Sequence, residues 1–299
     1  MRRQVFRSAV APALSVGKRF LTPTGDHSTP RGKTMNSDEL NKNTLIEDAR
    51  VIPANATYNN PTENYTWDTT DVKKVRITHK KPRGIVDNLA YGTTKLIRFA
   101  FDILSGYKFG KITDNKALRR ICFLETIAGV PGMVAGSIRH LSSLRRMRRD
   151  HGWIHTLLEE AENERMHLLT FMQLYNPGYA FRFLVIVTQA ILYNVLFLAY
   201  IVSPRYCHRL VGYIEEEAVR TYTHIIELVE EGKLFQDQEC PKIAISYWKL
   251  ADNAKILDLM VAVRADEAGH KLVNHTFADM HAEGLGNSTN PFLVKPHPK

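Results

Sequence analysis

Two Glu-x-x-His units are the residues of this sequence whose type and spacing most directly suggest chemistry. Glu164 precedes His167 by three positions, and Glu267 precedes His270 by the same interval. On an α-helix, side chains three positions apart project from one face, so each unit can direct a carboxylate and an imidazole at a common metal ion. One such unit alone is weak evidence, because Glu and His fall at this spacing by chance.

Further carboxylates lie in equally helical surroundings. Glu125 is the only acidic residue between Asp114 and Asp150, and its neighbours are apolar. A buried ionised carboxylate is costly unless it is paired or bound to a cation, which makes Glu125 a candidate ligand. A fourth helix carries three consecutive glutamates at positions 215–217.

Helical periodicity distinguishes among these three glutamates. At about 100° per residue, the apolar positions of this stretch fall on one face; they are Val211, Ile214, Ala218, Ile225 and Leu228. Glu216 points away from that face and is expected to face solvent, whereas Glu215 and Glu217 lie on its two flanks. Tyr222 is nearly eclipsed with Glu215, seven residues earlier, and would bring a phenol to the same site. This favours Glu215 as the ligand and leaves Glu217 as a residue of the surrounding pocket.

One glutamate from each of two helices, with a Glu-x-x-His unit from each of two others, is the ligand set of ferritin-like di-iron bundles. Carboxylate oxygens with two imidazoles suit iron or manganese, and the lack of thiolate ligands argues against structural zinc. The predicted ligands are Glu125, Glu164, His167, Glu215, Glu267 and His270. The alternative is a coincidence of core histidines and surface glutamates, and four helices together argue against it.

The elements that must position these residues all show the helical period, and no stretch alternates convincingly like a strand. Helices are predicted over residues 86–105, 115–148, 153–174, 183–203, 204–231 and 241–283. We therefore expect an all-α protein, a ferritin-like di-iron four-helix bundle with two additional membrane-lying helices.

The stretch 183–203 contains no charged residue and is long enough to cross roughly 30 Å of hydrocarbon. A true span would place His167 and Glu215 on opposite sides of the bilayer. Lying along the bundle, the same stretch supplies about 30 Å of helix and returns the chain, so that the helices before and after it run parallel. We expect this crossover, together with the helix at 86–105, to form a monotopic membrane anchor.

Composition narrows the class of protein further. The net charge is +9, yet the sequence has no zinc-finger spacing and no RNA-binding signature, so a basic face toward anionic lipid is favoured over nucleic acid. The three cysteines lie far apart, which argues against disulfides and favours a reducing compartment. Residues 1–25 are basic, with no acidic residue before Asp26 and no continuous apolar core. They are typical of a mitochondrial transit peptide, the alternative being a disordered basic tail.

Four motifs in this order, "LETIAGVPGMVAG", "ENERMH", "EEEA" and "RADEAGH", resemble the iron-binding motifs of the alternative oxidases. These are cyanide-insensitive di-iron ubiquinol oxidases of the mitochondrial inner membrane. The resemblance covers residues 67–273, and the composition is similar to the trypanosomal type. It implies two iron ions on the six residues above, and a respiratory-chain enzyme that reduces O2 to water with ubiquinol without pumping protons. It also implies a homodimer on the matrix face of the inner membrane.

The resemblance implies further roles by position. Tyr222 would be the redox-active tyrosine. The hydrogen-bond network around the metals would comprise Trp67, Asn163, Tyr247, Trp248 and Asp266. The quinol pocket would comprise Arg98, Asp102, Arg120, Leu124, Ala218 and Thr221, beside Glu217. A pocket position that is cysteine in some relatives is Ile121 here. No cysteine precedes Cys122, so thiol regulation of the plant kind is not expected.

The predicted organisation is a transit peptide at residues 1–25, an extended arm at 26–84, a di-iron helical oxidase domain at 85–285 and a tail at 286–299. Three other functions are compatible with parts of the pattern. They are a quinone-ring hydroxylase with the same ligands, an iron-storage or ferroxidase protein, and a non-catalytic helical scaffold at the membrane. The uncharged stretch 183–203 argues against a soluble storage shell.

Overall fold

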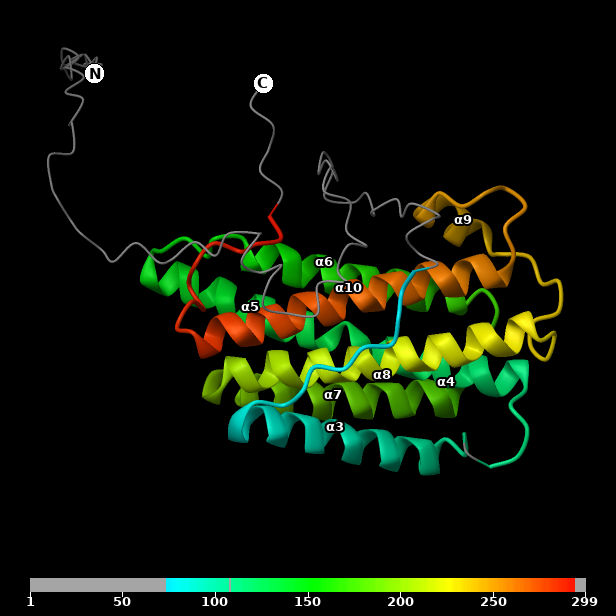
Figure 1. The fold of residues 1–299 in the computed structure, drawn as a ribbon, viewed down its shortest axis with the longest axis horizontal. Coiled ribbons are helices and arrows are strands. Elements are labelled where there is room, and N and C mark those ends of the chain that lie inside the picture. Colours follow the sequence, from blue (N-terminus) through cyan, green and yellow to red (C-terminus); the bar gives the residue numbers. More distant parts are fainter. Residues whose placement is uncertain (1–73, 108, 294–299) are drawn as a thin grey trace, which may run out of the picture. The chain divides into compact units, whose positions relative to one another are not determined.

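The computed structural model describes residues 74–107 and 109–293, and these residues form helices without any β-strand (Figure 1). The all-α prediction is therefore confirmed for the part of the chain described. In chain order the helices are α3 (Gly84–Leu104), α4 (Asp114–Ala128), α5 (Val130–Arg146), α6 (Trp153–Phe171), α7 (Tyr179–Val202), α8 (Pro204–Glu230), α9 (Lys242–Trp248) and α10 (Ile256–Ala282). The predicted transit peptide lies outside the described residues.

The bundle has four parts. One is formed by α4 and α5 in succession, and the other three are α6, α8 and α10. The pair α8 and α10 shares the most extensive contact. Residues 172–178 connect α6 to α7, and Ser203 alone connects α7 to α8. Such short connections join antiparallel neighbours, so α6 and α8 run in the same direction and α7 carries the chain back between them (Figure 1). As predicted for the crossover, α7 packs along the bundle, against α4, α5 and α8.

The predicted continuous helix at 115–148 is wrong in one detail, because it is interrupted at Gly129. Pro131 has no N–H to donate to the carbonyl four residues earlier, so α4 ends and α5 begins at this point. Gly132 then lets α5 approach α6 closely. A Cβ added at Gly132 would lie 2.5 Å from the carbonyl oxygen of Leu157. No larger residue fits there without moving the α6 backbone.

The predicted helix at 241–283 is also wrong in its extent, because the structure divides it into α9 and α10. Lys249 ends α9 in the left-handed region, with φ of 52°. Asp252 and Asn253 follow, and their short polar side chains compete for backbone hydrogen bonds and disfavour helix. α10 then begins with an Asp258 carboxylate that accepts a hydrogen bond from the Lys255 backbone N–H at 2.9 Å.

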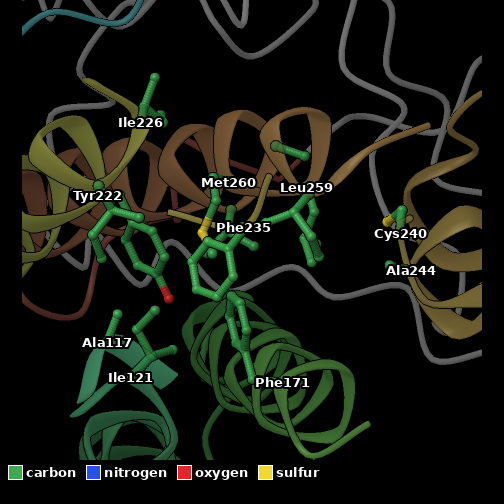
Figure 2. Packing of buried hydrophobic residues seen from close by; sticks show 14 of the residues in the cluster. Ala117, Ile121, Phe171, Tyr222, Ile226, Phe235, Cys240, Ala244, Leu259 and Met260 are labelled. Carbon is green, nitrogen blue, oxygen red and sulfur yellow. The ribbon is translucent and has the colours of Figure 1, made fainter. Parts of the chain in front are cut away.

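Two apolar clusters fill the bundle at different levels along its axis. The first takes side chains from four bundle helices and the loop after α8 (Figure 2); they include Ala117, Ile121, Phe171, Tyr222, Ile226, Phe235, Leu259 and Met260. The second includes Val134, Trp153, Leu157, Leu196, Tyr213 and Phe277. Along each part of the bundle (α4 with α5, α6, α8 and α10), the predicted ligands lie in sequence between members of the two clusters. The polar centre is thus enclosed by apolar packing on both sides.

The outer surface of α7 is apolar and exposed. Among the described residues, two helical stretches are long and apolar enough to cross a membrane, Asp114–Arg146 and α7. Only 11% of the α7 stretch is buried. The exposed α7 side chains include Phe183, Ile186, Ile191 and Leu198, and α3 exposes Leu89, Leu96, Phe99 and Leu104.

Candidate metal centre

Buried glutamates and histidines from the four parts of the bundle converge on two adjacent positions. One group consists of Glu125, Glu164, His167 and Glu267, and the other of Glu164, Glu215, Glu267 and His270. Within each group, one ligand atom per residue lies within 4.8 Å of all the others. Glu164 and Glu267 belong to both groups. The six residues predicted as ligands therefore form two overlapping sites that could each bind a metal ion.

Several candidate ligand atoms of this centre have no hydrogen bond. Both oxygens of Glu164, Oε2 of Glu125 and the Nδ1 atoms of His167 and His270 have no hydrogen-bond partner among the described residues. His167 Nδ1 lies 3.3 Å from Glu164 Oε2, and His270 Nδ1 lies 2.7 Å from Glu164 Oε1, but neither contact has hydrogen-bond geometry. Native interiors leave few polar atoms unpaired, so converging acceptors of this kind fit bound cations.

The close spacing of buried carboxylates also indicates a site for cations. Burial, followed by the charges of Glu267 and Glu164, raises the pKa of Glu215 well above its usual range. Burial also raises the pKa of Glu125 to about 8, with Glu164 and Glu267 adding to the effect. Carboxylates this close together destabilise each other's ionised forms, and metal cations between them would remove that penalty.

Asp266 holds His167 in the orientation of a metal ligand. Its Oδ2 lies 3.1 Å from His167 Nε2 and also accepts hydrogen bonds from Trp248 Nε1 at 2.8 Å and Asn163 Nδ2 at 3.1 Å. Asn163 Nδ2 also donates to the Tyr247 hydroxyl at 3.1 Å. A carboxylate on Nε2 fixes a proton there and directs Nδ1 toward the centre, so that Nδ1 is the atom that could bind a metal ion. The residues that the resemblance implied around the metals lie together here, apart from Trp67, which is outside the described residues.

Tyr222 lies at the boundary between the first apolar cluster and the centre. It is 4% exposed, and its hydroxyl donates a hydrogen bond to Glu125 Oε1 at 2.5 Å. Burial and the neighbouring charge of Glu125 raise the pKa of Tyr222 well above its usual range, so the phenol keeps its proton. Figure 2 shows the ring near Ala117 and Ile121 of α4.

A second polar cluster joins α3 to α8 and α4. Arg98 Nε lies 3.1 Å from both oxygens of Asp102, and Arg98 Nη1 donates to Thr221 Oγ1 at 3.0 Å. Arg120 Nη2 donates to Asp102 Oδ1 at 2.6 Å. Burial opposes ionisation of Asp102, but the two arginines lower its pKa overall. Arg98 Nη1 also lies 3.3 Å from Glu217 Oε2, so the residues expected in the quinol pocket lie together.

The two apolar residues expected in the same pocket lie on neighbouring helices. Leu124 precedes Glu125 on α4, and Ala218 lies one turn before Tyr222 on α8. Both side chains are half-buried. Ile121 belongs to the first apolar cluster.

The expectation that Glu216 faces solvent is wrong. Glu216 is 3% exposed and accepts a hydrogen bond from the Lys80 backbone N–H at 2.8 Å. His79 Nδ1 lies 2.6 Å from its Oε2, and His275 Nε2 lies 2.9 Å from its Oε1. The periodicity argument assumed that α8 has one buried face. Instead, α8 packs against α10, α3 and α7, and His79 and Lys80 of the segment before α3 cover Glu216.

A polar chain behind the centre was not found from the sequence. Asn274 Nδ2 donates to Glu160 Oε2 at 3.0 Å, and His208 Nδ1 lies 3.1 Å from Asn274 Oδ1. The Tyr200 hydroxyl lies 3.2 Å from His208 Nε2. These residues line a cavity of about 20 Å³, which also touches Glu164 and is large enough for one water molecule. Glu160 lies one turn before Glu164, and that spacing was the available signal.

Comparisons with known proteins agree with this centre. A family model described as alternative oxidase matches residues 67–279. The mitochondrial alternative oxidase of Trypanosoma brucei brucei is 52% identical over 257 residues, which cover 86% of this chain and 78% of that protein. The mitochondrial alternative oxidase of Ajellomyces capsulatus is 46% identical over 249 residues, covering 76% of this chain and 69% of the relative. With this match in sequence and a centre of six buried carboxylate and imidazole side chains, the chain belongs to the alternative oxidase family.

Proposed function

We propose that this protein is a ubiquinol oxidase that reduces O2 to water at a di-iron centre. The observation that carries the proposal is the pair of overlapping sites that share Glu164 and Glu267, with buried ligand atoms that lack hydrogen bonds. Membership of the alternative oxidase family supports the same reaction. Two ubiquinols each lose two electrons and two protons, and one O2 takes up all four of each to give two waters.

The residues fit iron by the chemistry of their donor atoms. Four carboxylates and two imidazoles, with no thiolate, suit iron rather than structural zinc. Glu125 and His167 would serve one ion, Glu215 and His270 the other, and Glu164 and Glu267 both. The two iron ions supply the redox chemistry of O2 reduction when bound. The apolar clusters on either side exclude water from the reacting groups.

Tyr222 holds a transferable proton beside the centre. Its hydroxyl donates to Glu125 Oε1, so loss of an electron from the ring can accompany transfer of the phenolic proton to that carboxylate. The buried phenol stays protonated at neutral pH, so Tyr222 can supply both an electron and a proton. Tyr222 would therefore act as the redox-active tyrosine.

The quinol would bind beside the polar cluster of α3 and α8. This cluster supplies charged and hydroxyl groups that can bind quinol oxygens. They belong to Arg98, Asp102, Arg120, Glu217 and Thr221. Thr221 is adjacent to Tyr222, so a quinol held there is close to the residue that exchanges electrons and protons with the centre.

The oxidase proposal is tested with purified protein, ubiquinol and an oxygen electrode. We expect O2 uptake that persists in cyanide, with ubiquinone and water as products. Glu215→Ala should lose iron and activity, and Tyr222→Phe should lose activity while keeping its iron. Glu227→Gln is the control on the same helix, because Glu227 is exposed. Full activity in Glu215→Ala contradicts the ligand assignment, and a hydroxylated quinone by mass spectrometry identifies a ring hydroxylase instead.

We also infer that α3 and α7 lie on lipid, as a monotopic anchor on the matrix side of the mitochondrial inner membrane. The exposed apolar side chains of both helices support this, and the similar proteins are named mitochondrial. Apolar side chains also project from α5, and we expect a second copy of the chain to cover them. They are Leu141 and Leu144 of α5 and Met147, which directly follows the helix.

Two triple variants separate the lipid surface from the homodimer surface. Changing Phe183, Ile186 and Ile191 of α7 to Gln should reduce flotation with anionic vesicles and leave the dimer mass unchanged. Changing Leu141 and Leu144 of α5 and the adjacent Met147 to Gln should do the reverse. Each variant is the control for the other, and an α7 variant that floats like the wild type argues against the lipid surface.

A further inference from the structure

The segment just before α3 is fastened to the outer side of two ligand-bearing helices. Residues 75–80, called the strap below, are extended and run over α8 and α10 (Figure 1). Val75 packs against Val219 of α8 and against Ala265 and Ala268 of α10. Lys271 Nζ donates a hydrogen bond to Thr78 Oγ1 at 2.7 Å. The strap thus contacts both helices at several levels.

Glu216 is the central attachment of the strap. Its carboxylate is buried between the strap and α10, with the Lys80 N–H and His79 Nδ1 on one side and His275 Nε2 on the other. Gly212 makes room for His275, because a Cβ there would lie 2.5 Å from the imidazole Nδ1. One carboxylate therefore ties three segments together in an interior where an unpaired charge is costly.

The end of the strap is fastened by charge. Lys80 Nζ forms an ion pair with Asp279 of α10. Asp279 also pairs with Arg209 of α8, and Arg209 Nε lies 3.2 Å from Asp87 Oδ1 of α3. This network joins α3, α8 and α10 directly behind the strap.

The attachment points are sequence neighbours of the predicted ligands. Glu216 follows Glu215, Ala268 follows Glu267, and Lys271 follows His270. Consecutive residues of a helix point about 100° apart, so a contact on the neighbour limits rotation of the same turn. The strap therefore restrains, from outside, the turns that direct three ligands inward.

We propose that the strap positions the metal ligands Glu215, Glu267 and His270 through Glu216. This rests on the proposed function for the assignment of those three residues as ligands. Glu216 and His79 are positioning residues, because neither belongs to the ligand groups. The strap fixes the rotation of α8 against α10 and so fixes the distance between Glu215 and His270.

The first test uses hydrogen–deuterium exchange on metal-free protein. His79→Ala removes one partner of Glu216 without changing either ligand helix. We expect faster amide exchange in the turns at 213–219 and 265–271. Ile77→Ala is the matched control, because Ile77 belongs to the strap but is 50% exposed. Unchanged exchange in His79→Ala overturns the proposal, and this result does not depend on iron or on oxidase activity.

The second test measures iron affinity by competition with a chelator and the mixed-valence electron paramagnetic resonance spectrum. Outer partners of metal sites are worth about 10–100-fold in affinity, and we expect His79→Ala and Glu216→Gln each to lose about tenfold and to shift the spectrum. The double variant should lose no more than Glu216→Gln alone, because both act through one contact.

Wild-type affinity and an unchanged spectrum in both variants, with only a lower unfolding temperature, would show that the strap is purely structural. Absence of iron from the wild-type protein would instead contradict the proposed function. The exchange experiment then still decides whether the strap restrains the two helices.

Discussion

At the scale of single residues, metal binding by His167 depends on which of its ring nitrogens carries a proton. Asp266 contacts Nε2, so Nδ1 is left free to bind metal. Trp248 and Asn163 donate to the same carboxylate oxygen and hold it in place. The proposed ligand His167 is therefore oriented by three side chains that do not belong to either group of candidate ligands.

Asp266→Asn tests this arrangement. The amide cannot balance an imidazole charge, and its NH2 group can turn toward His167 and favour the wrong tautomer. We expect iron affinity to fall about 10–100-fold, measured by chelator competition, with the helical content unchanged. Asp252→Asn, at an exposed turn, serves as the control. Equal iron affinity in wild type and Asp266→Asn would contradict the role of Asp266.

The convergence of the proposed ligand residues could be predicted from sequence because spacing within one helix fixes which side chains share a face. Glu164 with His167 and Glu267 with His270 are local pairs, and the structure brings them together. The burial of Glu216 could not be predicted, because it depends on residues 79, 80 and 275, far away in the sequence. Periodicity also could not locate the strap, since that segment has no regular pattern.

At the scale of elements, the close approach of α5 and α6 sets the width of the bundle beside the centre. Gly132 faces Leu157 and Ala161, which lie seven and three residues before Glu164 on α6. A backbone contact this short leaves no room for a side chain.

Gly132→Ala should destabilise the protein by about 1–3 kcal/mol, because the added Cβ meets backbone that must shift. Gly92→Ala on α3 is the matched control, since a Cβ there has no atom within 4 Å. That control should be neutral or gain up to about 1 kcal/mol from helix propensity. Thermal denaturation in detergent measures both. Equal unfolding temperatures for the two variants would contradict the close contact between α5 and α6.

At the scale of the whole molecule, three buried histidines make stability depend on pH. Burial lowers the pKa of His208 to about 3 and those of His275 and His281 to about 4. The unfolded chain has the ordinary histidine pKa of about 6.5 and therefore binds more protons than the fold below that pH. Their neutral forms stabilise the fold fully above about pH 6.5, and this contribution is lost as the pH falls toward 4.

The contribution of these three histidines to the free energy of unfolding should therefore fall between pH 6.5 and 4, with each of them contributing up to about 1.4 kcal/mol per pH unit. His281→Gln should reduce this slope, measured by urea unfolding at several pH values. His224→Gln should leave the slope unchanged, because His224 is exposed. Equal slopes for wild type and His281→Gln would mean that His281 does not titrate in this way.

The single-residue connection at Ser203 has a mechanical consequence. Ser203 ends α7, and its hydroxyl accepts a hydrogen bond from the Tyr206 N–H at 3.2 Å, which caps α8. Pro204 stiffens the same junction. A junction of one capped residue followed by a proline leaves few free torsions between the two helices, so we expect a displacement of α7 to be passed on to α8. With α7 on lipid, as proposed above, the lateral pressure of the bilayer acts through α7 on α8, the helix that carries Glu215. The physical state of the membrane would then influence the geometry of the centre.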